Sequence, residues 1–154
     1  MVIIFTVAAT PIRDLTKDEV ISPEELRDLQ LRKADFLLFD ARDSKAYDEA
    51  HIEGAILPLP REYYRQRELF RSRIIETEPD LNATLAEATR TYPKEIQMVT
   101  YCNSNCKASA FLLLQLKALG FNHVRAMEAG ISTWEAKGYP AVQGVPRLAS
   151  DSLN

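Results

Sequence analysis

Cys102 is the residue whose sequence context best fits a reactive nucleophile. It directly follows the apolar run Ile96 to Tyr101 and precedes a polar turn and a long apolar segment. In open parallel sheets, ligands bind where strands end, and the N–H groups of the next loop and helix attract anions. A thiol in such a place has a lowered pKa and is largely thiolate. This context favours a nucleophile in an anion-binding loop over a thiol that only packs.

The segment between Cys102 and the expected helix is our candidate for substrate binding. Successive backbone N–H groups in such a loop form a concave anion site, and we expect those of residues 103–108 to surround the sulfur. The candidate substrate-binding residues are Asn103, Ser104, Asn105, Cys106, Lys107, Ala108 and Ser109.

Cys106 lies four residues after Cys102, near the first turn of the expected helix. If the loop moves, Cys106 could form a disulfide with an oxidised or persulfidated Cys102, as in a redox switch or protective cycle. Alternatively, Cys106 only packs or caps the helix start. Disulfide formation depends on the separation and direction of the two Cβ atoms, so the sequence leaves both possibilities open.

Asp40 and Arg42 are candidates for a supporting role, because they follow another buried apolar run, Phe36 to Phe39. Neighbouring parallel strands end at the same edge of a sheet, so both side chains could reach the cysteine loop. We expect a buried ion pair that orients the loop rather than a substrate contact. Arg42 could also supply a cation to the loop, whose only cation is Lys107.

The elements that must position these residues alternate between strand and helix. Apolar runs predict buried strands at 36–40 and 96–101, and Ser22-Pro23-Glu24-Glu25 predicts a capped helix start. The other expected elements are strands at 20–21, 54–58 and 124–127, and helices at 22–30, 44–49, twice within 61–95, at 110–119 and at 131–137. Such alternation is typical of an α/β fold with a mostly parallel sheet.

Length and composition fit one globular domain. The 154 residues are 46% hydrophobic and 27% charged, with a net charge of −3, which excludes a disordered chain and a strongly basic nucleic-acid binder. Two cysteines exclude a disulfide framework. No apolar run reaches the roughly 18 residues of a membrane-spanning helix. We expect an N-terminal extension at 1–19, a domain at 20–145 and a flexible tail at 146–154.

The start of the chain bears on location. Met1 to Ala9 is apolar apart from Thr6, which is long enough for the core of an export signal. No Lys or Arg precedes Arg13, whereas such signals begin with positive charge. We therefore expect a short strand or docked arm and a cytoplasmic protein, with export as the alternative.

Four segments of the chain form a recognisable set: Phe39-Asp40-Ala41-Arg42; Tyr47 with His51-Ile52-Glu53-Gly54-Ala55; Tyr101-Cys102; and Glu128-Ala129-Gly130-Ile131 with Trp134 and Gly138-Tyr139-Pro140. They resemble motifs of the rhodanese-like domain family and occur in that family's order, with Ala129 in the place of the family's first glycine. Together they are specific, and the match covers about residues 20–143. The resemblance implies a three-layer α/β sandwich with a mostly parallel sheet of about five strands flanked by helices.

The resemblance also implies an activity. In the family, the loop cysteine takes a sulfur atom from a small sulfur-containing anion such as thiosulfate and becomes a persulfide. It then passes the sulfur to a thiophilic acceptor, either cyanide or a protein thiol, with no metal, cofactor, nucleic acid or membrane. Cys102 is the implied nucleophile, and Ser109 would bond to the terminal sulfur. His51 is expected to be structural, and Trp134 to lie in the core.

The loop departs from the family pattern in two ways. Six residues separate Cys102 from Ser109, one more than usual, and Ala108 stands where the family has an arginine. Without that arginine the loop cannot clamp a tetrahedral oxyanion bidentately, so we do not expect phosphatase activity. Two alternatives to sulfur transfer stay open: a thiol redox enzyme or oxyanion reductase that uses Cys102 and Cys106, and a non-catalytic binding module.

Overall fold

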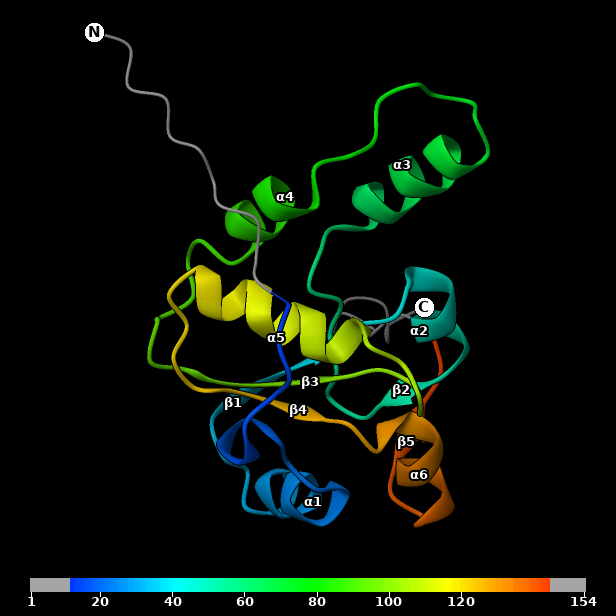
Figure 1. Ribbon diagram of the computed structural model, residues 1–154. Helices are drawn as coiled ribbons and strands as arrows, with labels where there is room; N and C mark the ends of the chain where they lie inside the picture. Colours follow the sequence, from blue (N-terminus) through cyan, green and yellow to red (C-terminus); the bar gives the residue numbers. More distant parts are fainter. Residues whose placement is uncertain (1–11, 145–154) are drawn as a thin grey trace, which may run out of the picture.

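A computed structural model describes residues 12–144 (Figure 1). Its core is a parallel sheet of β1 (Phe36–Asp40), β3 (Gln97–Tyr101) and β4 (Val124–Met127), with β3 in the centre. The remaining elements are a short 3₁₀ helix η1 (Lys17–Glu19), α1 (Pro23–Leu31), α2 (Ser44–Glu49), β2 (His51–Ile52), α3 (Arg61–Arg71), α4 (Leu81–Ala88), α5 (Ala108–Ala118), α6 (Gly130–Ala136) and β5 (Ala141–Val142).

Helices cover both faces of the sheet, which confirms the predicted three-layer α/β architecture. Helix α5 lies against one face with α3 and α4 beyond it, and α1 and α6 lie on the opposite side (Figure 1). The side chains of β3 alternate between the two layers: Met98 packs with the α5 side, whereas Val99 and Tyr101 pack with the α1 and α6 side. This alternation follows from the two-residue period of a strand.

Two of the predicted strands are single bridges rather than strands. Val20 pairs with Ala126 beside β4, and Ile56 pairs with Phe39 beside β1, so each edge of the sheet is extended by one residue. The prediction of a strand at 54–58 was therefore wrong in extent, because prolines at 58 and 60 have no N–H to continue a ladder. The sequence also gave no sign of the antiparallel pair that β2 forms with β5.

Residues ahead of the first helix are tied to the domain through a buried carboxylate. Glu19 is 3% exposed and accepts two hydrogen bonds from Arg13, at 2.6 and 2.9 Å. It also accepts the N–H of Thr16 at 2.9 Å, and Lys117 of α5 lies 2.7 Å away. Chiefly through Arg13, these partners hold the pKa of Glu19 well below its ordinary value of 4.5.

This cluster makes stability depend on acid pH. The unfolded chain takes up a proton at Glu19 near its ordinary pKa, whereas the folded chain does so only at lower pH, so the contribution is complete above about pH 5 and is lost as the pH falls further. We expect Glu19→Gln to lower the free energy of unfolding at pH 7 by about 2 kcal/mol and to flatten its decline in acid. Urea unfolding at several pH values measures both. Glu87→Gln, on an exposed ion pair with Arg90, should change little, and an equal effect there would contradict the assignment.

Within residues 12–144 no helix is long and apolar enough to cross a membrane. Two predictions concern segments outside the described residues. They are the short strand or docked arm at Met1 to Ala9, with an export signal as its alternative, and the flexible tail at 146–154.

Candidate functional site

Cys102 lies at the carboxyl end of the central strand, where β3 gives way to the loop that leads into α5. Cys102 is only 1% exposed, so its sulfur is almost completely enclosed by the protein. Its carbonyl accepts the N–H of Ile131, at the start of α6, at 3.0 Å. Cys102 therefore stands where the two helix layers and the end of the sheet meet, which is the position that strand and helix order predicted for a ligand site.

The structure joins Cys102 and Cys106 in a disulfide, with the two Cα atoms 6.1 Å apart. The turn between them is closed by a hydrogen bond from the Cys106 N–H to the Asn103 carbonyl at 3.2 Å, and Asn105 adopts a positive φ of 61°. The N–H of Ala108 donates to the Cys106 sulfur at 3.3 Å. The sequence had left open whether Cys106 pairs or packs, and the structure shows the paired form.

Ser109 places a hydroxyl group beside the Cys102 sulfur. Its side chain is buried, and its Oγ lies 3.4 Å from Cys102 Sγ. Its backbone is fixed as well, because Thr100 on β3 donates a hydrogen bond to the Ser109 carbonyl at 2.8 Å. The hydroxyl hydrogen can therefore point at the sulfur and stabilise a negative charge there.

We expect loss of this hydroxyl to slow reactions of the Cys102 thiolate. In a reduced Cys106→Ser background, only Cys102 reports on alkylation. There, Ser109→Ala should slow alkylation by iodoacetamide at neutral pH by about fivefold, because one hydrogen bond to a charged group is lost. Ser104→Ala, which removes an exposed hydroxyl from the same loop, is the matched control. Equal rates in all three proteins would show that Ser109 does not act on the sulfur.

The start of α6 packs against the loop that follows Cys102. Ser132 Oγ lies 2.9 Å from Asn103 Oδ1. Gly130 has a φ of +82°, and a Cβ atom there would lie only 2.6 Å from both the carbonyl carbon of Asn103 and the nitrogen of Ser104. The backbones of loop and helix therefore touch at a point that only glycine permits. A glycine just after a strand is a signal for such an approach, although the sequence does not reveal its partner.

Asp40 and Arg42 support the loop indirectly, through Tyr101. Asp40 is fully buried and accepts hydrogen bonds from the Arg42 guanidinium, at 2.7 and 3.0 Å, and from the Tyr101 hydroxyl at 2.9 Å. That hydroxyl in turn accepts the Ile52 N–H at 3.1 Å. Burial, and then the Asp40 charge, raise the pKa of Tyr101, so it stays protonated. The network fixes the residue that directly precedes Cys102.

Arg42 is held in this network through its Nε and one of its two terminal nitrogens. Besides its bonds to Asp40, its guanidinium donates to the carbonyl of Ala50. These bonds hold the guanidinium against Asp40 and Ala50 rather than in the cysteine loop. His51 is likewise structural: its Nδ1 lies 2.8 Å from the Tyr47 carbonyl, and its ring stacks on that of Tyr47 with centroids 3.8 Å apart.

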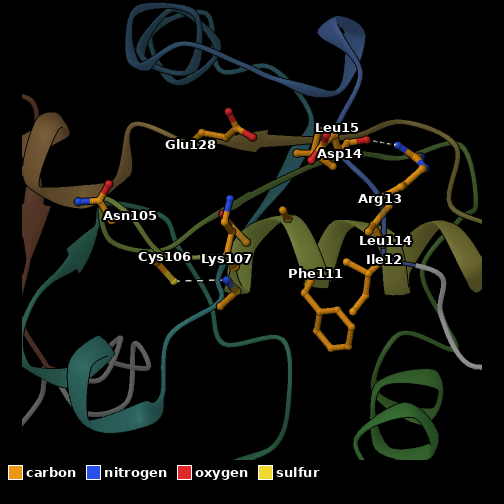
Figure 2. Close-up of a pocket in the computed structure, with 13 residues that line it drawn as sticks. Ile12, Arg13, Asp14, Leu15, Asn105, Cys106, Lys107, Phe111, Leu114 and Glu128 are labelled. Atoms are coloured by element: carbon orange, nitrogen blue, oxygen red, sulfur yellow. Dashed lines mark hydrogen bonds between the residues drawn. The ribbon is translucent and has the colours of Figure 1, made fainter.

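A cavity of about 1050 Å³ opens beside the loop. Its walls are the segment Ile12 to Leu15, the loop residues Asn105 to Lys107, the first turns of α5 and Glu128 (Figure 2). Cys106 lines this cavity, whereas Cys102 does not. Of the candidate substrate-binding residues, Asn105 to Ser109 thus face one cavity. Asn103 and Ser104 lie outside it, against Gly130.

Residues 22–137 match the rhodanese-like domain family. The chain belongs to this family. The match spans β1, the cysteine loop, α5 and α6. It confirms the resemblance that the four motifs carry.

The fold of this rhodanese-like domain recurs in solved structures at low sequence identity. The BH2092 protein from Bacillus halodurans has a TM-score of 0.61 at 20% identity, covering 89% of this chain and 90% of that one. SseA from Escherichia coli, whose structure is described with the mechanism of 3-mercaptopyruvate sulfotransferases, scores 0.60 at 17%, covering 86% and 54%. Thiosulfate sulfurtransferase from Pseudomonas aeruginosa scores 0.56 at 16%, covering 82% and 20%. These likenesses establish the fold.

Curated relatives give a different kind of match. The tRNA uridine(34) hydroxylases of Onion yellows and Aster yellows witches'-broom phytoplasmas are 29% and 30% identical to the rhodanese-like domain over 133 and 134 residues. Those segments take in 85% and 86% of this chain but only 37% of each hydroxylase. The chain therefore spans little more than a third of the length of these relatives.

Proposed function

We propose that this rhodanese-like domain is a sulfurtransferase that carries sulfur as a persulfide on Cys102. The observation that supports this best is the placement of the sulfur: it lies at the end of the central strand, enclosed, with the hydroxyl of Ser109 at 3.4 Å. The partners in this proposal are a small sulfur-containing anion and a thiol acceptor. It involves no metal, cofactor, nucleic acid or membrane.

The first half-reaction loads the sulfur. The Cys102 thiolate attacks the outer sulfur of thiosulfate, a new S–S bond forms, and the S–S bond of thiosulfate breaks with its electron pair leaving on sulfite. The product is a persulfide whose terminal sulfur is anionic. The hydroxyl of Ser109 is suited to stabilise that charge. In the disulfide form the N–H of Cys106 is bonded to the Asn103 carbonyl and that of Ala108 to the Cys106 sulfur, so these two groups can turn to the persulfide only after the loop rearranges on reduction. Since Cys102 and Cys106 form a disulfide, the pair must be reduced before loading.

The second half-reaction unloads it. A thiolate or cyanide attacks the terminal sulfur of the persulfide, the S–S bond breaks, and Cys102 recovers its electron pair as a thiolate. No water has to act as a nucleophile, and no base has to remove a proton in either half. A reducing compartment such as the cytoplasm, where disulfides are transient and catalytic, would supply thiol acceptors.

Intact-protein mass spectrometry tests this proposal. The reduced protein is incubated with thiosulfate, and we expect wild type to gain one sulfur atom, Cys102→Ser to gain none, and cyanide to remove the gained sulfur. Cys106→Ser is the matched control, since it keeps Cys102 and should still load. Absence of loading in wild type would contradict the proposal.

The same measurement separates the two alternatives. If thiosulfate or an oxidant produces only the intramolecular disulfide, and this requires Cys106, a thiol redox enzyme or reductase is favoured. If Cys102→Ser leaves every measured property unchanged, a binding module is favoured instead.

A further inference from the structure

The two sulfurs of the disulfide differ in their surroundings. Cys102 is 1% exposed and lies against the buried Ser109, beneath the start of α5. Cys106 is half-buried and forms part of the wall of the 1050 Å³ cavity. Figure 2 shows its sulfur beside the cavity. The N–H of Ala108 donates a hydrogen bond to this sulfur. A molecule in that cavity therefore meets the sulfur of Cys106 and not that of Cys102.

The cavity suits an organic thiol. Ile12, Leu15 and Phe111 supply apolar surface. The charged side chains in the wall are Arg13, Lys107, Asp14 and Glu128. Arg13 is paired with Glu19, whereas Lys107, the residue directly after Cys106, is exposed and makes no ion pair within residues 12–144. A cation beside the disulfide favours an approaching thiolate. The volume is ample for a molecule the size of a small peptide.

We propose that Cys106 is the site at which an external thiol enters the redox pair and forms a mixed disulfide. The thiolate attacks Cys106 Sγ from the cavity, the bond between Cys106 and Cys102 breaks, and its electron pair goes to Cys102 Sγ. A second thiol then attacks the external sulfur of the mixed disulfide, releasing a free disulfide and leaving the Cys106 thiolate. The two external thiols are oxidised to a disulfide, and Cys102 and Cys106 are reduced by the same two electrons.

Two factors that control the rate of thiol–disulfide exchange, access to the attacked sulfur and stability of the departing thiolate, both favour attack at Cys106. The attacked sulfur must be accessible, and of the two cysteines it is Cys106 that lines the 1050 Å³ cavity. The departing sulfur leaves faster when its thiolate is better stabilised, and Cys102 has the buried hydroxyl of Ser109 beside it. Attack at Cys106 therefore produces a free Cys102 thiolate while Cys106 is still bonded to the external thiol. The consequence for sulfur loading rests on the proposed function, whereas the entry of the thiol at Cys106 does not.

A trapping experiment with glutathione tests which sulfur is attacked. Oxidised wild type is incubated briefly with reduced glutathione, quenched in acid and alkylated with N-ethylmaleimide. Trypsin should release both cysteines in one peptide, residues 95–107, and its fragment spectrum locates each group. We expect glutathione on Cys106 and maleimide on Cys102, in excess over the reverse arrangement by on the order of tenfold. Equal amounts, or an excess of the reverse, would overturn the proposal.

A second measurement decides the matter if the mixed disulfide does not accumulate. Ala110 on α5 lines the cavity, whereas Ala118, exposed on the same helix, does not. We expect Ala110→Phe to slow reduction of the disulfide by glutathione about tenfold, because it narrows the approach to Cys106, and Ala118→Phe to leave the rate unchanged. Equal rates in both variants would overturn the proposal. Neither measurement uses a sulfur donor, so failure of sulfur loading would be seen separately.

Discussion

Gly130→Ala is expected to unfold the protein at markedly lower urea concentration and to disorganise the cysteine loop. The new Cβ would lie 2.6 Å from two backbone atoms of Asn103 and Ser104, and backbone cannot swing aside as a side chain can. The positive φ of 82° adds a conformational cost of about 1–2 kcal/mol for any residue with a Cβ. With the overpacking, we expect a loss of about 3–5 kcal/mol, a large share of a typical stability of about 5–15 kcal/mol.

Gly138→Ala is the control that separates the two costs. Gly138 has a similar φ of +76°, but a Cβ there meets nothing within 4 Å. This variant should therefore lose only the conformational part, about 1–2 kcal/mol. If urea unfolding gives the same loss for both alanine variants, the contact between α6 and the loop is not the constraint that we infer. Thiosulfate loading should fall in Gly130→Ala alone.

The second large effect is expected at Asp40, whose carboxylate holds Arg42 and Tyr101. Asp40→Ala would leave the mostly buried guanidinium, 15% exposed, without its anion and the Tyr101 hydroxyl without its acceptor. Removing one partner of a buried pair costs about 3–5 kcal/mol. Because Tyr101 directly precedes Cys102 in the chain, the variant should also load sulfur more slowly at a temperature where it remains folded.

Asp48→Ala provides the comparison on the surface. Asp48 also binds an arginine through both oxygens, Arg61 at 2.7 and 2.9 Å, but the two side chains are 39% and 45% exposed. An ion pair of this kind is worth less than about 1 kcal/mol. Thermal unfolding of the two variants side by side measures the difference. A similar loss at both sites would mean that burial does not set the importance of Asp40.

The sequence predicted the structure best where one continuous segment has the residue pattern of a buried strand or helix. The apolar run before Cys102 identified β3, and the leucines after it identified α5, because both elements are buried on more than one side. The position of Cys102 followed from their order alone. The strand expected at 54–58 failed because its apolar residues make one bridge, at Ile56, before the prolines intervene.

The contacts that the sequence did not predict join residues that are far apart in the chain. The pairing of His51 and Ile52 with residues 141–142 involves two residues on each side and has no local pattern. The approach of Gly130 to Asn103 and the link from Asp40 to Tyr101 likewise arise only when the strands assemble. The disulfide between Cys102 and Cys106 was left open because it depends on how the loop turns, which residue types do not specify.

The closeness of Cys102 and Cys106 in the chain has a thermodynamic consequence. A crosslink between residues only four apart restricts the unfolded chain very little, and the chain-entropy relation gives about 2 kcal/mol for a ring of this size, less than for a long loop. Making or breaking the bond should therefore leave the domain folded in either state. A change in the oxidation state of the pair would then alter the chemistry of one loop, while the rest of the molecule keeps its shape.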